Sequence, residues 1–205
     1  MASIVNLFPI RVYHTQIVPT EEQLDQSLYV LNEAFKLCNV NSWHGESGKS
    51  TGEVFSLDLH MNPVFDWLFK EVDIHVQKYW NETLEYTDTL KPTIRDSWCN
   101  LHMIDQSTDL HCHNDGALGN AHVSGVFYME KVERERNIEF IDPNDLIHRL
   151  TPRKNMIGIN PKSESFFTKS FDLLLFPSWL QHRVKPNIYD KPRIAISFNY
   201  IGYEI

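Results

Sequence analysis

The N-terminal part of the chain combines one strand pattern with two helix patterns. Residues 4–18 alternate apolar and polar side chains, which is typical of a β-strand. From Thr20 onward the apolar residues recur at helical spacing, and Thr20 with Gln23 fits a reciprocal capping box. A second helical stripe runs from about Asn62 to Leu84, with Pro63 in its first turn. We therefore expect a strand followed by two helices that pack on a sheet.

After Pro92 the pattern changes to short apolar runs separated by turn-rich segments. No helices alternate with these runs, so the pattern favours an antiparallel sandwich or barrel. The predicted class is α+β, in one domain over residues 1–205, with the strand and helices in 1–91 and the β-core in 92–205. Predicted loops or connections cover residues 39–51, 133–136 and 142–162. Predicted strands of the β-core cover residues 94–104, 123–129, 138–141, 165–168, 172–176 and 193–201.

Composition and charge narrow the classes of function. Hydrophobic residues make up 42% and charged residues 22%, which are ordinary globular values. The formal net charge of −8 disfavours nucleic-acid binding through bulk electrostatics, because phosphate contacts need a basic face. Three scattered cysteines give no disulfide framework, and no stretch approaches the ~20 apolar residues of a membrane span. We therefore expect a cytoplasmic protein in a reducing compartment, without a membrane partner.

Two distant segments carry side chains that can hold a metal. His111, His113 and Asp115 occupy alternate positions, and in an extended chain alternate residues point to one side. His182 follows an apolar strand and a proline turn, where a side chain can face the mouth of a barrel. Two imidazoles and one carboxylate, with open positions, form the ligand set of non-haem Fe(II) oxygenases. Arg193 begins the last apolar strand, and a buried charge there requires a partner such as an anionic ligand.

Six short motifs follow one another along the chain. They are Leu7-Phe-Pro9, Ser97-Trp-Cys-Asn100, His111-Cys-His113, Ser124-Gly-Val-Phe-Tyr128, Phe176-Pro-Ser-Trp-Leu-Gln-His182 and Arg193-Ile-Ala-Ile-Ser-Phe-Asn199. Together they resemble the Fe(II)/2-oxoglutarate-dependent oxygenase superfamily, and within it a subgroup frequent in marine bacteria and phages. The resemblance implies a double-stranded β-helix core, a cupin-like jelly roll, with the N-terminal helices packed on its sheet.

The resemblance also implies a set of metal ligands. His182 would be the distal ligand. The superfamily pattern His-x-Asp aligns His113 and Asp115 as the proximal ligands, and we prefer this assignment because such sites usually pair two imidazoles with one carboxylate. The subgroup pattern His-x-His aligns His111 and His113 instead, which leaves His111 as the alternate ligand. His122 is a further candidate outside both patterns.

The cofactors implied by the resemblance are Fe(II), 2-oxoglutarate as co-substrate, and O₂. The implied reaction converts 2-oxoglutarate to succinate and CO₂ while a C–H bond of the substrate is hydroxylated. Arg193 would bind the far carboxylate of 2-oxoglutarate in a bidentate pair, and Tyr128 would hydrogen-bond the same carboxylate. Asn100 and Ser197 would assist from strands that line the barrel. The substrate, small molecule or peptidyl residue, would be met in the cytoplasm, or in a host cytoplasm if the chain is viral.

Two other classes of function remain open from the sequence. A jelly-roll binding module could recognise a carbohydrate or protein partner without turnover, but it would not need a buried arginine ready for a dicarboxylate. A cupin-type metalloprotein that does not use 2-oxoglutarate usually has more histidines on its metal. A ligand set of His111, His113 and His182 keeps that class open. The sequence does not indicate the oligomeric state.

Overall fold

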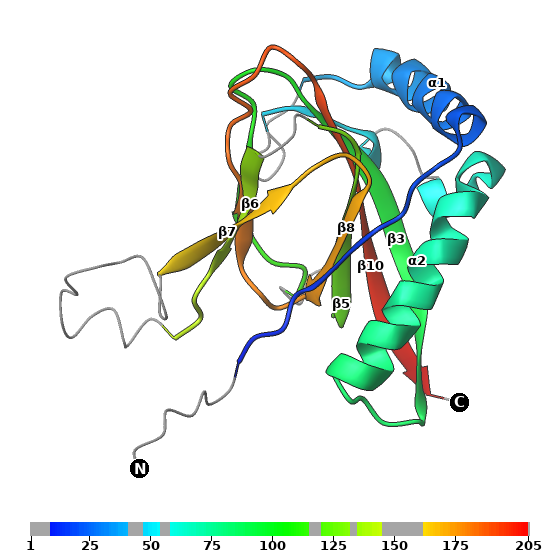
Figure 1. Ribbon diagram of the computed structural model, residues 1–205, viewed down its shortest axis with the longest axis vertical. Coiled ribbons are helices and arrows are strands. Elements are labelled where there is room, and N and C mark those ends of the chain that lie inside the picture. Colours follow the sequence, from blue (N-terminus) through cyan, green and yellow to red (C-terminus); the bar gives the residue numbers. More distant parts are fainter. Residues whose placement is uncertain are drawn as a thin grey trace.

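The described part of the chain folds into two antiparallel β-sheets, with the helices α1 and α2 on the outer face of the larger one (Figure 1). The computed structural model describes residues 9–40, 47–53, 58–114, 120–131, 135–144 and 162–204. The larger sheet has the order β1 (Tyr13–Gln16), β8 (Asp172–Pro177), β5 (Val123–Glu130), β10 (Arg193–Glu204), β3 (Leu90–His102), β2 (Lys49–Ser50). The smaller sheet has the order β4 (Thr108–His111), β9 (His182–Val184), β6 (Glu135–Ile141), β7 (Ser163–Thr168).

Helix α1 (Glu21–Leu37) begins at the capping box that the sequence predicts. The hydroxyl oxygen of Thr20 accepts a hydrogen bond from the backbone N–H of Gln23 at 3.2 Å. The side chain of Gln23 accepts one from the backbone N–H of Thr20 at 2.8 Å. Both bonds satisfy N–H groups that a helix start leaves without intrahelical partners. The buried side of α1, with Leu31 and Phe35, joins the apolar layer on the larger sheet.

The second helical segment is built from three geometries. A 3₁₀ turn, η4 (Pro63–Phe65), leads into α2 (Asp66–Lys78), which continues as a π-helical turn, η5 (Tyr79–Thr83). The helix predicted from about residue 62 to residue 84 is therefore confirmed, although only its middle is α-helical. Among the residues that the structure describes, no helix has both the length and the apolar character that a membrane span requires.

The strands of the larger sheet send alternate side chains into two different layers, as the pleat of a strand requires. One layer is the apolar core beneath the helices, to which β10 contributes Ile194, Ile196 and Phe198. The other layer faces the smaller sheet and lines a cavity, to which β10 contributes Arg193, Ala195, Ser197 and Asn199. The helices thus stabilise one face of the sheet, and its other face is left for a site.

The structure corrects several boundaries. Lys49 and Ser50, predicted to lie in a loop, form the edge strand β2 against β3. Glu135, predicted to lie in a connection, begins β6. Strands β4 and β9 were not predicted, because runs of three or four residues are too short for alternation to be recognised. Of the strand predicted over residues 4–18, only β1 is observed: residues 9–12, 17 and 18 are described but do not belong to a strand, and residues 4–8 lie outside the described part. Residues 145–161 of the predicted loop 142–162 also lie outside the described part.

Candidate metal centre and cavity

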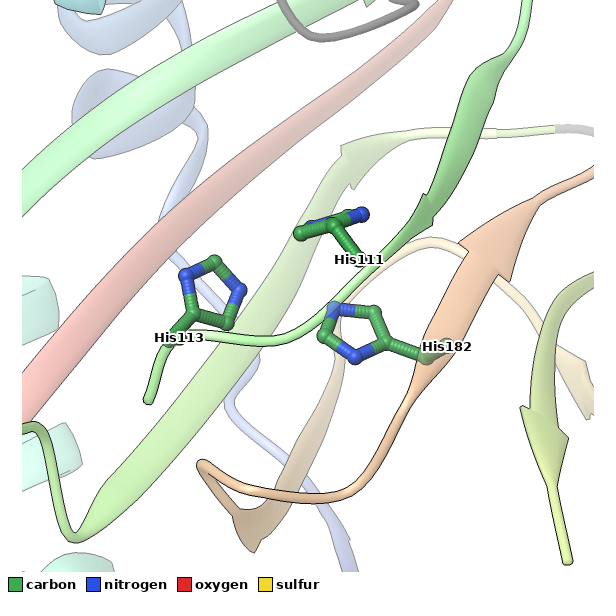
Figure 2. Close-up of side chains that lie close together, drawn as sticks. All are labelled: His111, His113 and His182. Atoms are coloured by element: carbon green, nitrogen blue, oxygen red, sulfur yellow. The ribbon is translucent and has the colours of Figure 1, made fainter. Parts of the chain in front are cut away.

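Three histidine side chains gather between the two sheets (Figure 2). His111 ends β4, His113 follows two residues later, and His182 begins β9. Strands β4 and β9 are neighbours in the smaller sheet, with His111 paired directly to His182. The ring nitrogens that could act as ligands all lie within 4.8 Å of one another. Strand pairing thus joins the two segments that the sequence analysis singled out.

Backbone carbonyls orient two of the three rings. Nδ1 of His182 lies 2.9 Å from the carbonyl oxygen of Leu180, and Nδ1 of His111 lies 2.8 Å from that of Asp109. A carbonyl oxygen can only accept, so each Nδ1 carries the proton and donates it. The lone pair of the neutral ring is then on Nε2, which is the atom that can ligate a metal.

Burial favours the neutral form of His182 and His113. The pKa of His182 is lowered to about 3, first by burial and then by the nearby His111 ring, while the hydrogen bond to Leu180 acts in the opposite direction. The pKa of His113 is well below its usual value, first because of burial and then because of His182, His111 and Arg95. A neutral imidazole is the form that binds a metal, so these rings need not lose a proton at neutral pH. Such nitrogen donors suit a divalent metal such as Fe(II).

The identity of the third ligand stays a prediction. Asp115, the preferred carboxylate, lies outside the described residues. The alternate residue, His111, belongs to the group itself, because its ring centroid lies 4.3 Å from that of His182 and 5.0 Å from that of His113. The described geometry therefore supports a role for His111 beside the two other histidines. It does not test the assignment of Asp115 as a ligand.

His122, the further candidate, lies elsewhere. Its ring centroid is 5.6 Å from that of Trp80 and 5.8 Å from that of Tyr86. Its Nδ1 accepts a hydrogen bond from the backbone N–H of Gly202 at 3.3 Å. His122 is not among the described side chains that could hold a metal together, and its contacts give it a place in the packing.

A cavity of about 330 Å³ extends from the three histidines into the space between the sheets. The four residues predicted to bind 2-oxoglutarate line it as well. Strand register explains their proximity, because Ala195 on β10 is paired with Asn100 on β3 and with Tyr128 on β5. Arg193 and Ser197 lie two residues to either side of Ala195, on the same face. The structure brings these side chains together, and their role towards 2-oxoglutarate stays a prediction.

The cavity wall contains polar groups suited to a polar ligand. The side chain of Arg193 is buried, and its Nη2 donates a hydrogen bond to the carbonyl oxygen of Lys185 at 3.0 Å. Guanidinium stays charged at all ordinary pH values, so an anion in the cavity would offset part of the cost of burying it. Oδ1 of Asn100 is buried and has no hydrogen-bond partner among the described residues, and an atom of this kind often binds a ligand or a water molecule.

Sequence reasoning missed a polar end of the cavity. Arg95, Asp96 and Asn199 line it, on β3 and β10. Nε of Arg95 lies 2.5 Å from Oδ2 of Asp96, and Nδ2 of Asn199 donates to Oδ1 of Asp96 at 2.7 Å. One signal was present in the sequence: alternation along the last strand places Asn199 on the same face as Arg193 and Ser197. Arg95 and Asp96 give no such signal, because consecutive residues of a regular strand point to opposite faces.

Two facing antiparallel sheets, a group of three histidines and a buried arginine in one cavity define a jelly-roll protein with a candidate metal centre. A family model described as "Putative 2OG-Fe(II) oxygenase" matches residues 96–199, which is just over half of the chain. The chain therefore belongs to the 2OG-Fe(II) oxygenase family, and the predicted enzyme class and its cofactors, Fe(II), 2-oxoglutarate and O₂, are confirmed. No curated protein sequence matches the chain. The resemblance to a marine bacterial and phage subgroup stays a prediction.

Solved structures share the fold. HygX from Streptomyces hygroscopicus, with nickel, 2-oxoglutarate and hygromycin B bound, has a TM-score of 0.61 at 14% identity, over 93% of this chain and 82% of that one. A prolyl-4-hydroxylase from Pseudomonas putida has a TM-score of 0.60 at 12% identity, over 93% and 92%. The viral collagen prolyl hydroxylase from Paramecium Bursaria Chlorella virus-1, in a 2-oxoglutarate complex, has a TM-score of 0.56 at 12% identity, over 92% and 94%. At such identities the likeness concerns the fold alone, and it confirms the predicted double-stranded β-helix.

Proposed function

We propose that this oxygenase hydroxylates its substrate while 2-oxoglutarate is converted to succinate and CO₂. In this proposal His182 and His113 are metal ligands, and the third is either Asp115 or His111. The observation that carries it is the placement of three imidazoles on the same cavity as the buried guanidinium of Arg193. A binding module without turnover would not need both groups in one cavity.

The donor atoms fit the metal. The lone pairs on Nε2 of His111 and His182 follow from the carbonyl hydrogen bonds at Nδ1. Iron and 2-oxoglutarate, when bound, supply the oxidising chemistry that consumes O₂. The chain would hold the far carboxylate of 2-oxoglutarate through Arg193, whose planar fork of donors matches a carboxylate. Tyr128 would add a hydroxyl donor, and the apolar wall of the cavity, which includes Phe176, would keep bulk water out.

The size of the cavity bears on the substrate. Ligand pockets usually measure about 300–1,000 Å³, so a cavity of about 330 Å³ is at the small end of that range. It can hold the co-substrate and a small reacting part of a second molecule. Both a free small molecule and a side chain presented by a peptide meet this limit, and the similar structures include prolyl hydroxylases as well as HygX with hygromycin B.

Anaerobic addition of Fe(II) and 2-oxoglutarate tests the proposal, because the ternary complex has a charge-transfer absorption band. We expect the band in the wild-type protein. His182→Ala should abolish it by loss of the metal, and Arg193→Ala should abolish it while the metal still binds. His122→Ala is the matched control, since this histidine lies outside the group, and it should keep the band.

The same titration separates the two ligand sets. If His111 is the third ligand, His111→Ala loses Fe(II) and Asp115→Ala keeps it. If Asp115 is the third ligand, the two results are reversed. Wild-type protein that binds Fe(II) but gives no band with 2-oxoglutarate would contradict the proposal, and it would favour a cupin-type metalloprotein.

A further inference from the structure

A line of polar side chains, buried except for that of Asp96, crosses the larger sheet at the polar end of the cavity. Asp96, Asn199 and Ser124 are paired neighbours on β3, β10 and β5, and Ser178 directly follows β8. Asn199 Nδ2 donates to Asp96 Oδ1 at 2.7 Å, and Asn199 Oδ1 lies 2.6 Å from Ser124 Oγ. Ser124 Oγ lies 2.8 Å from Ser178 Oγ. We call these four residues the polar chain.

The hydrogen bonds of the polar chain have a defined direction. A serine hydroxyl has one proton, and the amide oxygen of Asn199 can only accept, so Ser124 donates to Asn199. The proton of the bond between the two serines then comes from Ser178. The series ends at the carboxylate of Asp96, where the last hydrogen bond is charge-assisted. Ser124, Ser178 and Asn199 are at most 2% exposed, and a buried network that is fully satisfied fixes the geometry of what it touches.

Ser178 connects the polar chain to the candidate metal centre. Its carbonyl oxygen accepts a hydrogen bond from the backbone N–H of His113 at 2.9 Å. Its own N–H donates to the carbonyl oxygen of His122 at 3.1 Å. The backbone of Ser178 therefore holds both ends of the segment that begins with His113 and ends with His122. Its hydroxyl group connects this anchoring point, through Ser124 and Asn199, to the strands β5, β10 and β3 of the larger sheet.

We propose that the polar chain positions His113 for metal binding. It acts through the backbone of Ser178, which sets where His113 lies relative to His111 and His182. Its members are positioning residues rather than ligands. This inference rests on the proposed function, because it takes His113 to be a metal ligand. Residues that orient metal ligands typically change metal affinity by about 10- to 100-fold when they are replaced.

The test compares two buried serines. Ser124→Ala breaks the polar chain in its middle. Ser27→Ala is the control: Ser27 is fully buried in α1, and its hydroxyl accepts a hydrogen bond from Nε1 of Trp67 at 3.2 Å, within the helix packing. Both variants lose one buried hydroxyl, so both should lose thermal stability in the metal-free form. Only Ser124→Ala should weaken Fe(II) binding, by about 10-fold or more, in an anaerobic competition with a chelator.

Ser178→Ala provides a second variant in case Ser124→Ala does not fold. It removes the last hydroxyl of the polar chain and keeps the backbone bonds to His113 and His122, and the same loss of affinity is expected. Unchanged Fe(II) affinity in a folded Ser124→Ala or Ser178→Ala protein would overturn the inference alone. An equal loss of affinity in Ser27→Ala would also overturn it, since a general loss of stability would then explain the effect. Wild-type protein that does not bind Fe(II) would overturn the proposed function and this inference with it.

Discussion

Gly125 has no room for a side chain, which gives a prediction with a magnitude. It lies in β5, paired with Phe198 on β10 and Leu175 on β8. A Cβ atom on Gly125 would lie 2.3 Å from Cε2 of Phe198 and 2.8 Å from Cδ2 of Leu175. Carbon atoms in favourable contact are about 3.5–4.0 Å apart, so Gly125→Ala would force the ring of Phe198 to move by about 1 Å.

The ring of Phe198 is held on several sides. It is fully buried, and its centroid lies 6.1 Å from that of Phe69 on α2 and 5.9 Å from that of Tyr200. Overpacking a core costs about 1–3 kcal/mol, and a clash with two neighbours places Gly125→Ala in the upper part of that range. The reduced entropy of the unfolded chain offsets about 0.4–1 kcal/mol. The net loss of stability is then about 2 kcal/mol, which lowers the melting temperature by about 4–8 °C for a chain of this size.

Thermal unfolding followed by circular dichroism measures the effect. Gly52→Ala is the control, because a Cβ there would lie 3.4 Å from Cβ of Trp98, close to ordinary contact, and its melting temperature should change much less. Adding Phe198→Leu to Gly125→Ala should cost less than the sum of the two single changes, since the smaller side chain relieves the clash. A melting temperature of Gly125→Ala equal to that of the wild type would refute the packing argument, and so would strict additivity in the double variant.

Three further changes test the cavity and the smaller sheet. Arg193→Lys keeps the charge but not the bidentate fork, so the affinity for 2-oxoglutarate should fall by about 10-fold or more while the affinity for Fe(II) stays unchanged. A titration of the absorption band that gives the wild-type affinity for 2-oxoglutarate would speak against the assignment of Arg193. Tyr128→Phe should weaken 2-oxoglutarate binding by about 1 kcal/mol, or roughly 5-fold, through loss of one hydrogen bond, measured in the same titration. Burial raises the pKa of Glu139, but hydrogen bonds led by that of Lys185 outweigh it and hold this pKa below its usual value. Glu139 therefore stabilises the folded protein at pH values above the ordinary pKa of a glutamate. This contribution is lost as the pH falls through the lower pKa that Glu139 has in the folded state. In urea unfolding, Glu139→Gln should be less stable than the wild type at neutral pH, and the gap should close in acid; a gap that does not depend on pH would contradict this.

The fold could be predicted wherever one element carries enough repeats of its own pattern. The capping box at Thr20 and the helical stripe after it identify α1 from local sequence alone, and the structure confirms both hydrogen bonds. The long apolar runs predicted the strands β5, β8 and β10. Strands β4 and β9 could not be predicted, because three or four residues become a strand only through pairing with distant neighbours. These two short strands bring His111 to His182, so the part of the fold that places the site was the part least visible in the sequence.

The candidate site was predictable where residue type and alternation coincide. His111 and His113 were singled out by their spacing, and Arg193 by its position at the start of an apolar strand. The polar chain was not predictable, because its members come from three strands and the turn after β8, and they meet only through the register of the sheet. Ser178 illustrates this, since its functional link to His113 runs through its backbone, and no side-chain pattern reports a backbone hydrogen bond.

The third ligand decides the charge balance of the centre. Two imidazoles and the carboxylate of Asp115 would leave a single net positive charge on bound Fe(II), whereas a third imidazole, that of His111, would leave two. The cavity already contains the positive charge of Arg193. The positive charge of Arg95 also lowers the pKa of His113. A centre with three neutral ligands would therefore gain more from the dianion 2-oxoglutarate than a centre with a carboxylate. Because coupling between two ligands is reciprocal, 2-oxoglutarate would tighten Fe(II) binding more strongly in the three-histidine centre. The two ligand sets thus differ in how strongly metal and co-substrate support each other, a property that alternate positions in the sequence do not reveal.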